Sequence, residues 1–170
     1  MNTAPQIPAP LPWRDLQDTL AGSFSARARG LLANAFAIQK GGSTIGHLVF
    51  DGLDGAEFVA GTLKFTIERK PNGDYEMFSG DDRILTASPP TSSLDALEIT
   101  CGEGVYQSRI SFLRNEARAF SAKGDKTAML KGSVVGWRYE VTTDQTDAAL
   151  PIAVLLIYHT ATFRRRAYVT

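Results

Sequence analysis

Few residues of this chain are of the types that carry out catalysis or bind metals, and their spacing suits neither role. The two histidines, His47 and His159, lie far apart, and the chain contains no His-x-x-x-His pair and no Cys/His spacing typical of a zinc site. We expect each histidine to be hydrogen-bonded within the fold, because a neutral imidazole can be satisfied by a single partner. The sequence therefore predicts neither a metal site nor a cofactor.

Cys101 is the single cysteine, so the chain forms no internal disulfide, which suits a reducing compartment. A catalytic thiolate needs a nearby base or cation, and the sequence identifies none, so we expect an inert strand residue. The following Gly102-Glu103-Gly104 lacks the third glycine and the strand-to-helix setting of a dinucleotide-binding loop. Asp81-Asp82 is interpreted as a turn rather than a calcium site. We predict that the protein is not an enzyme. The alternative is an enzyme whose active-site cleft the sequence does not reveal.

The strongest local charge is formed by Arg164, Arg165 and Arg166. Adjacent cations at a helix end can contact phosphate groups, so these residues are the candidate site for anionic lipid headgroups. The alternative is that they complement the dipole of the helix that they end. Lys and Arg together number 18, as do Asp and Glu, so the formal net charge is zero with neutral His. No whole-molecule field favours nucleic acid, and we predict no nucleic-acid partner.

The segment before these arginines is the most apolar part of the chain, and no charged residue interrupts positions 148–163. As a helix it would be about 24 Å long, shorter than the hydrocarbon core of a bilayer, which is about 30 Å thick. Asp147 or Thr146 is expected to cap the helix, with Pro151 tolerated in the first turn. We predict a helix over residues 147–165 that is apolar all round because protein surrounds it, with a membrane anchor as the alternative.

Most of the chain before this helix is typical of short strands joined by tight turns. Predicted strands at residues 29–39 and 44–50 are followed by one at 62–69, where apolar and polar residues alternate. Asn72-Gly73 predicts a type I′ turn, which would pair that last strand with Tyr75–Ser79. Short strands and turns of this kind continue along the chain to Gly136–Val141. They amount to roughly ten to twelve strands, which favours a closed or nearly closed antiparallel sheet.

A sheet of that size encloses too wide an interior for its own side chains to fill, because about eight strands is the size at which they do so. The apolar C-terminal helix would fill that interior. It would also leave little room for a ligand cavity, so we predict no small-molecule substrate.

The first 12 residues contain Pro5, Pro8, Pro10 and Pro12, no charge, and no apolar run of signal-peptide length. This composition predicts an extended, mobile arm over residues 1–12, followed by one domain over residues 13–170, at whose start Trp13 is expected to lie across a barrel end or edge. Because nothing in the arm is typical of export, the expected location is the cytoplasm.

The order of these elements is similar to that of a known family. The chain has many short strands in two similar halves, and the last of them is Gly136–Val141. A short acidic and polar link follows, and then an apolar helix with basic residues after it. This order resembles the tubby C-terminal-like superfamily. This group includes tubby domains, phospholipid scramblases and LURP-one-related proteins. The resemblance is one of pattern and covers about residues 30–166. It implies a mainly β fold, a closed antiparallel barrel of about twelve strands around a central hydrophobic C-terminal α-helix.

The resemblance also implies a class of partner, because tubby domains and some relatives engage phosphoinositide headgroups. The tubby lipid-binding residues and the calcium-binding segment of scramblases are not carried over, since no position of this chain matches them. We predict a non-enzymatic cytoplasmic binding or scaffold domain, peripheral to the membrane, whose candidate partners are an anionic phospholipid headgroup or a protein. The main alternative is a scramblase-like protein whose C-terminal helix inserts in the bilayer.

Overall fold

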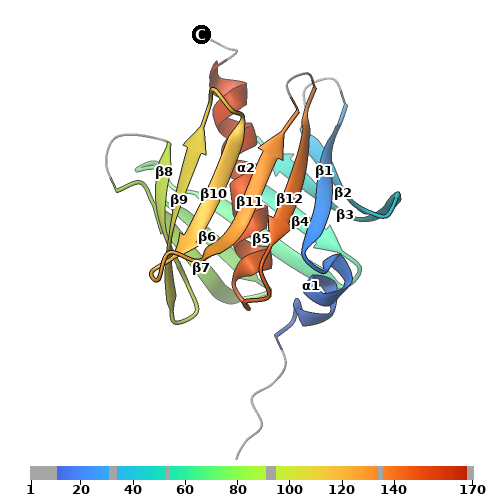
Figure 1. Ribbon diagram of the computed structural model, residues 1–170, viewed down its shortest axis with the longest axis horizontal. Coiled ribbons are helices and arrows are strands. Elements are labelled where there is room, and N and C mark those ends of the chain that lie inside the picture. The colour runs from blue at the N-terminus through green and yellow to red at the C-terminus, as the bar shows by residue number, and fades with distance from the viewer. Residues whose placement is uncertain (1–10, 31–33, 53, 91–94, 134–135, 168–170) are drawn as a thin grey trace, which may run out of the picture.

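A closed antiparallel β-barrel surrounds the helix α2 (Ala149–Ala167), as Figure 1 shows. The computed structural model describes residues 11–30, 34–52, 54–90, 95–133 and 136–167. This part of the chain contains twelve strands, which confirms the predicted fold class. Before α2 the elements are, in chain order, α1 (Arg14–Leu20), β1 (Ser23–Arg29), β2 (Ala35–Lys40), β3 (Ser43–Asp51), β4 (Gly55–Ala60), β5 (Leu63–Arg69), β6 (Tyr75–Ser79), β7 (Asp82–Ser88), β8 (Ala96–Cys101), β9 (Gly104–Ser111), β10 (Glu116–Ser121), β11 (Lys126–Gly132) and β12 (Arg138–Thr143).

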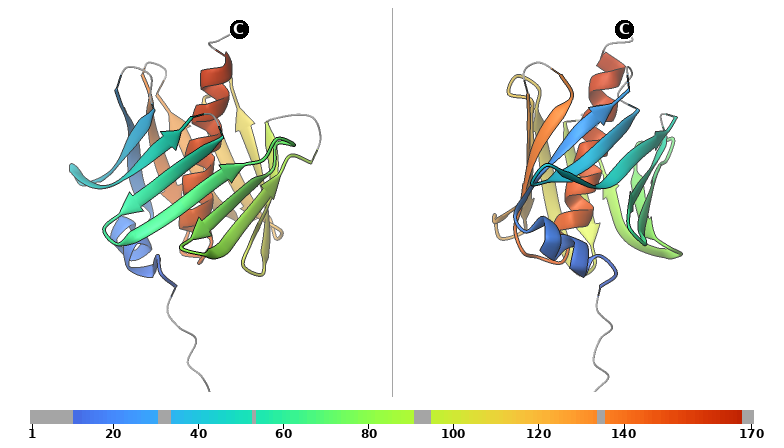
Figure 2. Two further views of the ribbon diagram at one scale, coloured as in Figure 1. Left: turned by 180° about the vertical axis from the view of Figure 1, so that it is seen from behind. Right: turned by 90° about the vertical axis from the view of Figure 1, so that its right-hand side faces the viewer.

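Each strand pairs with its neighbours in the sequence, and β1 closes the barrel by pairing with β12, where Phe24 lies opposite Val141. Closure leaves no sheet edge along the wall. Because every connection joins antiparallel neighbours, the turns lie alternately at the two ends of the barrel. We call the end at which α2 leaves the barrel the exit end, and the end at which α2 begins the cap end (Figures 1 and 2).

The predicted hairpin between β5 and β6 is present, but its turn differs from the prediction. A type I′ turn needs positive φ at both central residues, and here only Gly73 has one, at 92°. The side chain of Asn72 instead accepts a hydrogen bond from the backbone N–H of Asp74 at 3.1 Å. The N–H of Lys70 donates to the carbonyl of Asp74, which makes a longer turn.

Two elements near the start of the chain were not predicted, α1 and β1. The sequence of β1, Ser-Phe-Ser-Ala-Arg-Ala-Arg, is poor in the β-branched and aromatic residues that favour strands. It forms a strand because it pairs on both sides, with β2 and with β12. The strand predicted at residues 29–39 is observed as β2, from Ala35, and residues 31–33 lie outside the described residues.

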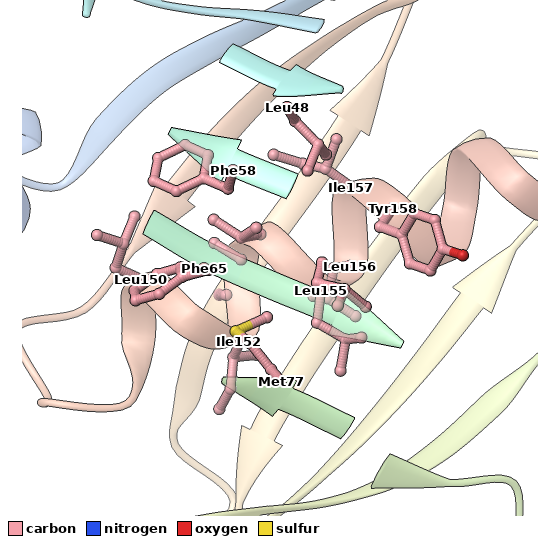
Figure 3. Close-up of a cluster of buried hydrophobic side chains, with 14 of the residues drawn as sticks. Leu48, Phe58, Phe65, Met77, Leu150, Ile152, Leu155, Leu156, Ile157 and Tyr158 are labelled. Carbon is pink, nitrogen blue, oxygen red and sulfur yellow. The ribbon is translucent and has the colours of Figure 1, made fainter. Parts of the chain in front are cut away.

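The helix α2 fills the barrel, and its side chains from Ala148 to Thr162 are buried in every direction. This confirms the prediction of a helix that is apolar all round because protein surrounds it. In the described part of the chain, no helix combines the length and the apolar character needed to cross a membrane. Figure 3 shows part of the interior, with Leu150, Ile152, Leu155, Leu156, Ile157 and Tyr158 of α2 packed among Leu48, Phe58, Phe65 and Met77 of the wall.

The two sides of the wall differ in the size of their inward side chains. On β10 and β11 these include Ala117, Ala119 and Ala128, and α2 lies closest to this side. Across the barrel, β3 to β6 contribute large side chains such as Phe50 and Phe65, and the ring of Phe50 packs edge-on against Tyr158 at 5.2 Å. Small residues let the helix backbone approach one side, and large residues fill the wider gap on the other.

The short helix α1 closes the cap end and holds the start of α2. Trp13, just before α1, is buried, and its Nε1 donates to the carbonyl of Asp147 at 2.7 Å, which confirms its predicted place across a barrel end. Gln17 donates to the carbonyl of Thr146 at 2.7 Å and accepts from the N–H of Leu150 at 3.4 Å. A glutamine from another helix therefore satisfies a free amide of the first turn of α2.

The side chains predicted to cap α2 have other partners. The hydroxyl of Thr146 donates to Asp144 at 2.7 Å, and the carboxylate of Asp147 pairs with Arg14. The helix accordingly begins at Ala149 and ends at Ala167, two residues later at each end than predicted. Pro151 lies in its first turn, as expected. Most of the predicted arm, residues 1–10, lies outside the described residues.

Candidate functional site

The three arginines predicted as one anionic site point to three different parts of the exit end. The guanidinium of Arg164 lies 4.2 Å from the ring centre of Trp137, and its Nη1 donates to the hydroxyl of Tyr139 at 3.3 Å. Arg165 lies 5.4 Å from the ring centre of Phe50. Successive helix residues are turned by about 100°, so adjacent arginines face different strands. The three cations are distributed around the rim of the barrel and do not form a pocket for one headgroup.

Arg166 faces a third part of the rim, where it approaches a fourth cation that sequence reasoning missed. Its Nη2 lies 4.0 Å from Oδ1 of Asp54, which also lies 3.7 Å from Nη1 of Arg69. Arg69 ends β5 and is mostly buried against the barrel mouth. Arg69 stands two residues after Ile67, in the inward-facing register of the alternating strand, so this alternation was the available signal that its side chain turns towards the barrel interior.

Beside Arg69, a tyrosine of the wall and a histidine of the helix form a buried hydrogen bond. The hydroxyl of Tyr75 and Nδ1 of His159 are 2.6 Å apart, and the two rings pack edge-on at 5.3 Å. Burial raises the pKa of Tyr75, and the charge of Arg69 opposes this rise. The prediction that His159 is a buried, hydrogen-bonded residue of the core is confirmed.

A small pocket opens next to this pair, lined by Arg69, Tyr75, His159, Thr162, Phe163 and Arg166. Its volume is about 10 Å³, which is close to the least that holds one water molecule. The arrangement of a tyrosine, a histidine and two arginines therefore has no room for a substrate. Its effect is to hold α2 in one rotation about its axis.

The exit end also carries an apolar turn between β9 and β10. Phe112 is 45% exposed and Leu113 is 102% exposed. The ring of Phe112 stacks on Phe163 of α2 with 4.2 Å between ring centres, and Arg114 follows in the turn. The strand β9 ends at Ser111, so Phe112 and Leu113 belong to the turn although they continue the apolar composition of the strand.

A cavity of about 690 Å³ lies at the cap end between β7, the β8–β9 turn and the start of α2. Cys101 ends β8 there, and burial raises the pKa of its thiol to about 11, so the thiol is protonated at neutral pH and is a weak nucleophile. His47 is exposed on β3, so the expectation that it packs within the fold as His159 does is wrong, and it does not line this cavity. Other residues that line the cavity are Trp13, Arg83, Leu85, Glu103, Tyr106 and Asp147.

The remaining residues considered for chemistry are likewise dispersed. Asp81 lies in the turn between β6 and β7 as predicted, whereas Asp82 already belongs to β7. Within the described ranges, no three His, Cys, Asp or Glu side chains lie close enough together to hold a metal ion. The exit end carries the arginines, spaced around its rim, together with the apolar turn that packs on α2.

Comparisons with known proteins bear on the fold. No protein-family model and no curated protein matches the sequence. The chain is similar to an X-ray structure of a protein from Arabidopsis thaliana, with a TM-score of 0.57 and 15% sequence identity, over 80% of this chain and 88% of that chain. At this identity the likeness concerns the fold alone.

Proposed function

We propose that the protein is a non-enzymatic, tubby-like binding domain that attaches to anionic membranes from the cytoplasmic side through its exit end. The observation that carries the proposal is the filled interior. Because α2 occupies the space inside the wall, a partner must bind at an end or on the outer face. At the exit end the cations face different strands, which suits a broad anionic surface better than a single small ligand.

The distribution of charge between the two ends supports this orientation. Basic residues outnumber acidic ones among the strand termini, connections and last helical turn of the exit end. The basic residues there are Arg29, Arg69, Lys70, Arg114, Arg138, Arg164, Arg165 and Arg166, and the acidic ones are Asp51, Asp54, Asp74, Asp95 and Glu116. The reverse holds at the cap end, where Asp15, Asp18, Asp81, Asp82, Glu103, Asp125, Asp144 and Asp147 lie with Arg14, Lys40, Arg83, Lys123 and Lys126. A chain without net charge is thereby polarised along α2, and an anionic surface attracts its exit end.

The burial of α2 also weighs against the alternative in which this helix inserts in a bilayer. To leave the barrel, the helix would have to expose the inner face of the wall, including Phe58, Phe65 and Met77, to water. Each such side chain is worth about 1.5–3 kcal/mol on burial. Attachment through the rim needs no such rearrangement.

Vesicle binding tests the proposal. The protein should cosediment with vesicles that contain phosphatidylserine or a phosphoinositide and not with vesicles of phosphatidylcholine alone, and added salt should weaken the binding. Replacing Arg164, Arg165 and Arg166 by Gln should reduce the binding. Replacing Lys40, Lys123 and Lys126 by Gln removes the same charge from the cap end and should leave the binding unchanged.

Two outcomes would contradict the proposal. One is that the unmodified protein does not bind anionic vesicles at any salt concentration. The other is that the two triple variants lose binding equally, since this would mean that no particular end of the barrel faces the membrane. In the first case, a protein partner becomes the better candidate for the exit end.

A further inference from the structure

We propose that the β9–β10 turn is a membrane-insertion tip, in which Leu113 enters the apolar boundary of the bilayer while neighbouring arginines contact headgroups. This inference rests on the proposed membrane function and deepens it. It adds an apolar contact, which salt does not screen, to the electrostatic attraction of the exit end.

The exposure of the turn distinguishes it from the other apolar residues on the surface. Val49, Val59 and Val105 are 40–49% exposed on the outer face of the wall. They lie opposite the polar residues Glu57, His47 and Thr100 of the paired strands, and partial exposure of this kind is ordinary for a folded protein. At the turn, Leu113 is 102% exposed directly beside the half-exposed Phe112. The two side chains form one contiguous apolar surface at the end of the molecule, which suits a site of apolar contact.

Contacts on two sides hold the turn in place, so Leu113 stays exposed and does not fold back against the barrel. Phe112 stacks on Phe163 with an interplanar angle of 26°, which attaches the turn to α2. Asn115 adopts a positive φ of 50°. Its side chain donates to the carbonyl of Ser133 at 3.0 Å, and its backbone carbonyl accepts from the N–H of Gly132 at 2.7 Å. A tip held in its binding conformation loses little conformational freedom on contact with a membrane.

The chemistry around the tip matches the boundary between headgroups and acyl chains. Arg114 is next to Leu113 in the turn, and Arg164 follows Phe163 in α2 and lies over Trp137. Arginines can keep their charge at the headgroups while their stems and the adjoining rings contact apolar chains, and tryptophan is enriched at this depth. This combination of cations with an exposed apolar tip favours an anionic membrane over a purely apolar partner.

Two measurements test the tip on the intact protein. In the first, Leu113→Ser should weaken binding to phosphatidylcholine and phosphatidylserine vesicles about tenfold, because part of a leucine side chain no longer leaves water. The loss should persist at high salt, whereas the loss caused by replacing Arg164, Arg165 and Arg166 should diminish. The matched control is Val105→Ser, which removes a 46% exposed residue from the cap end of the same strand, β9, and should leave the affinity unchanged.

In the second measurement, a polarity-sensitive fluorophore is attached to a cysteine introduced at position 113, in a chain in which Cys101 is replaced by Ala. Its emission should shift to the blue and increase when these vesicles are added, and the same label at position 105 should not respond. If the unmodified protein fails to bind the vesicles, both the membrane function and the tip are wrong. If it binds through its arginines, but Leu113→Ser binds equally well and the label at 113 is silent, the tip alone is overturned.

Discussion

Tyr75 of β6 and His159 of α2, 84 residues apart in the chain, share a buried hydrogen bond of 2.6 Å between the tyrosine hydroxyl and Nδ1. The bond joins the wall of the barrel to the helix inside it. Most other contacts of α2 are apolar packing, which is not directional. The bond therefore helps to set the rotation of α2, and with it the strand that each of the last arginines faces.

We predict that Tyr75→Phe lowers the free energy of unfolding by about 1 kcal/mol, because it removes one buried hydrogen bond and leaves the ring in place. His159→Phe should cost at least as much, since it also changes the shape of the side chain. Urea unfolding of both single variants and of the double variant measures the coupling between the two residues. Additive effects in this cycle would mean that the bond contributes nothing to stability.

The interior should not tolerate a charge. Leu155 is fully buried, so Leu155→Asp places a carboxylate in the core at a cost of several kcal/mol and should abolish soluble folding. The same substitution at Leu113, which is fully exposed, should leave the soluble yield and the melting temperature close to those of the unmodified protein. Normal expression and unchanged melting of Leu155→Asp would refute the placement of α2 inside the barrel.

The cap end offers a test of how α2 is held at its start. Gln17→Leu removes the acceptor of the Leu150 N–H and the donor to the Thr146 carbonyl, and should destabilise the protein by about 2 kcal/mol. For a chain of this size, this corresponds to a fall in melting temperature of about 4–8 °C. Asp18→Ala, an exposed position of the same helix, is the control and should melt as the unmodified protein does. Equal melting of both variants would show that α1 does not support α2.

Stability should fall in alkali, and Cys101 contributes to this fall. Its thiol has an ordinary pKa of 9.0 and a pKa of about 11 in the folded protein, so between these values the unfolded chain loses a proton that the folded chain retains. The stabilisation is complete below pH 9 and is lost as the pH rises towards 11, to a total of about 2–3 kcal/mol at most. Tyr158, whose pKa is raised to about 12, extends the loss to higher pH.

Urea unfolding at several pH values between 8.5 and 11 measures this dependence. The variant Cys101→Ala should show a smaller loss of stability over this interval than the unmodified protein. A pH dependence that is identical in the two proteins would mean that Cys101 is not buried as a neutral thiol.

The barrel and its helix were predictable because both have local signals. The alternation of Leu63, Phe65 and Ile67 with polar residues, and the uncharged run from Ala148 to Phe163, report burial directly. The element β1 has no such signal, and pairing with two neighbours makes it a strand. The support that Gln17 gives to α2 joins residues 133 positions apart, and no local pattern indicates a contact of that kind.

The candidate site was predictable only in part. Arg164, Arg165 and Arg166 do lie at the barrel mouth, but their adjacency in sequence suggested a cluster, whereas the helix turns each to a different strand. The apolar tip was hidden because Phe112 and Leu113 continue the composition of the strand before them. Where a strand ends is decided by pairing, and β10 pairs with β9 only as far as Ser111.

The position of α2 in the chain has a consequence for biosynthesis. All twelve strands leave the ribosome before α2 does, so the hairpins of the wall emerge while the residues that cover their inner faces have yet to be made. Pairing of β1 with β12 also joins segments more than a hundred residues apart, which slows folding. The nascent chain therefore carries exposed apolar strands until synthesis reaches α2, and in this interval it should depend on chaperones and be prone to aggregation.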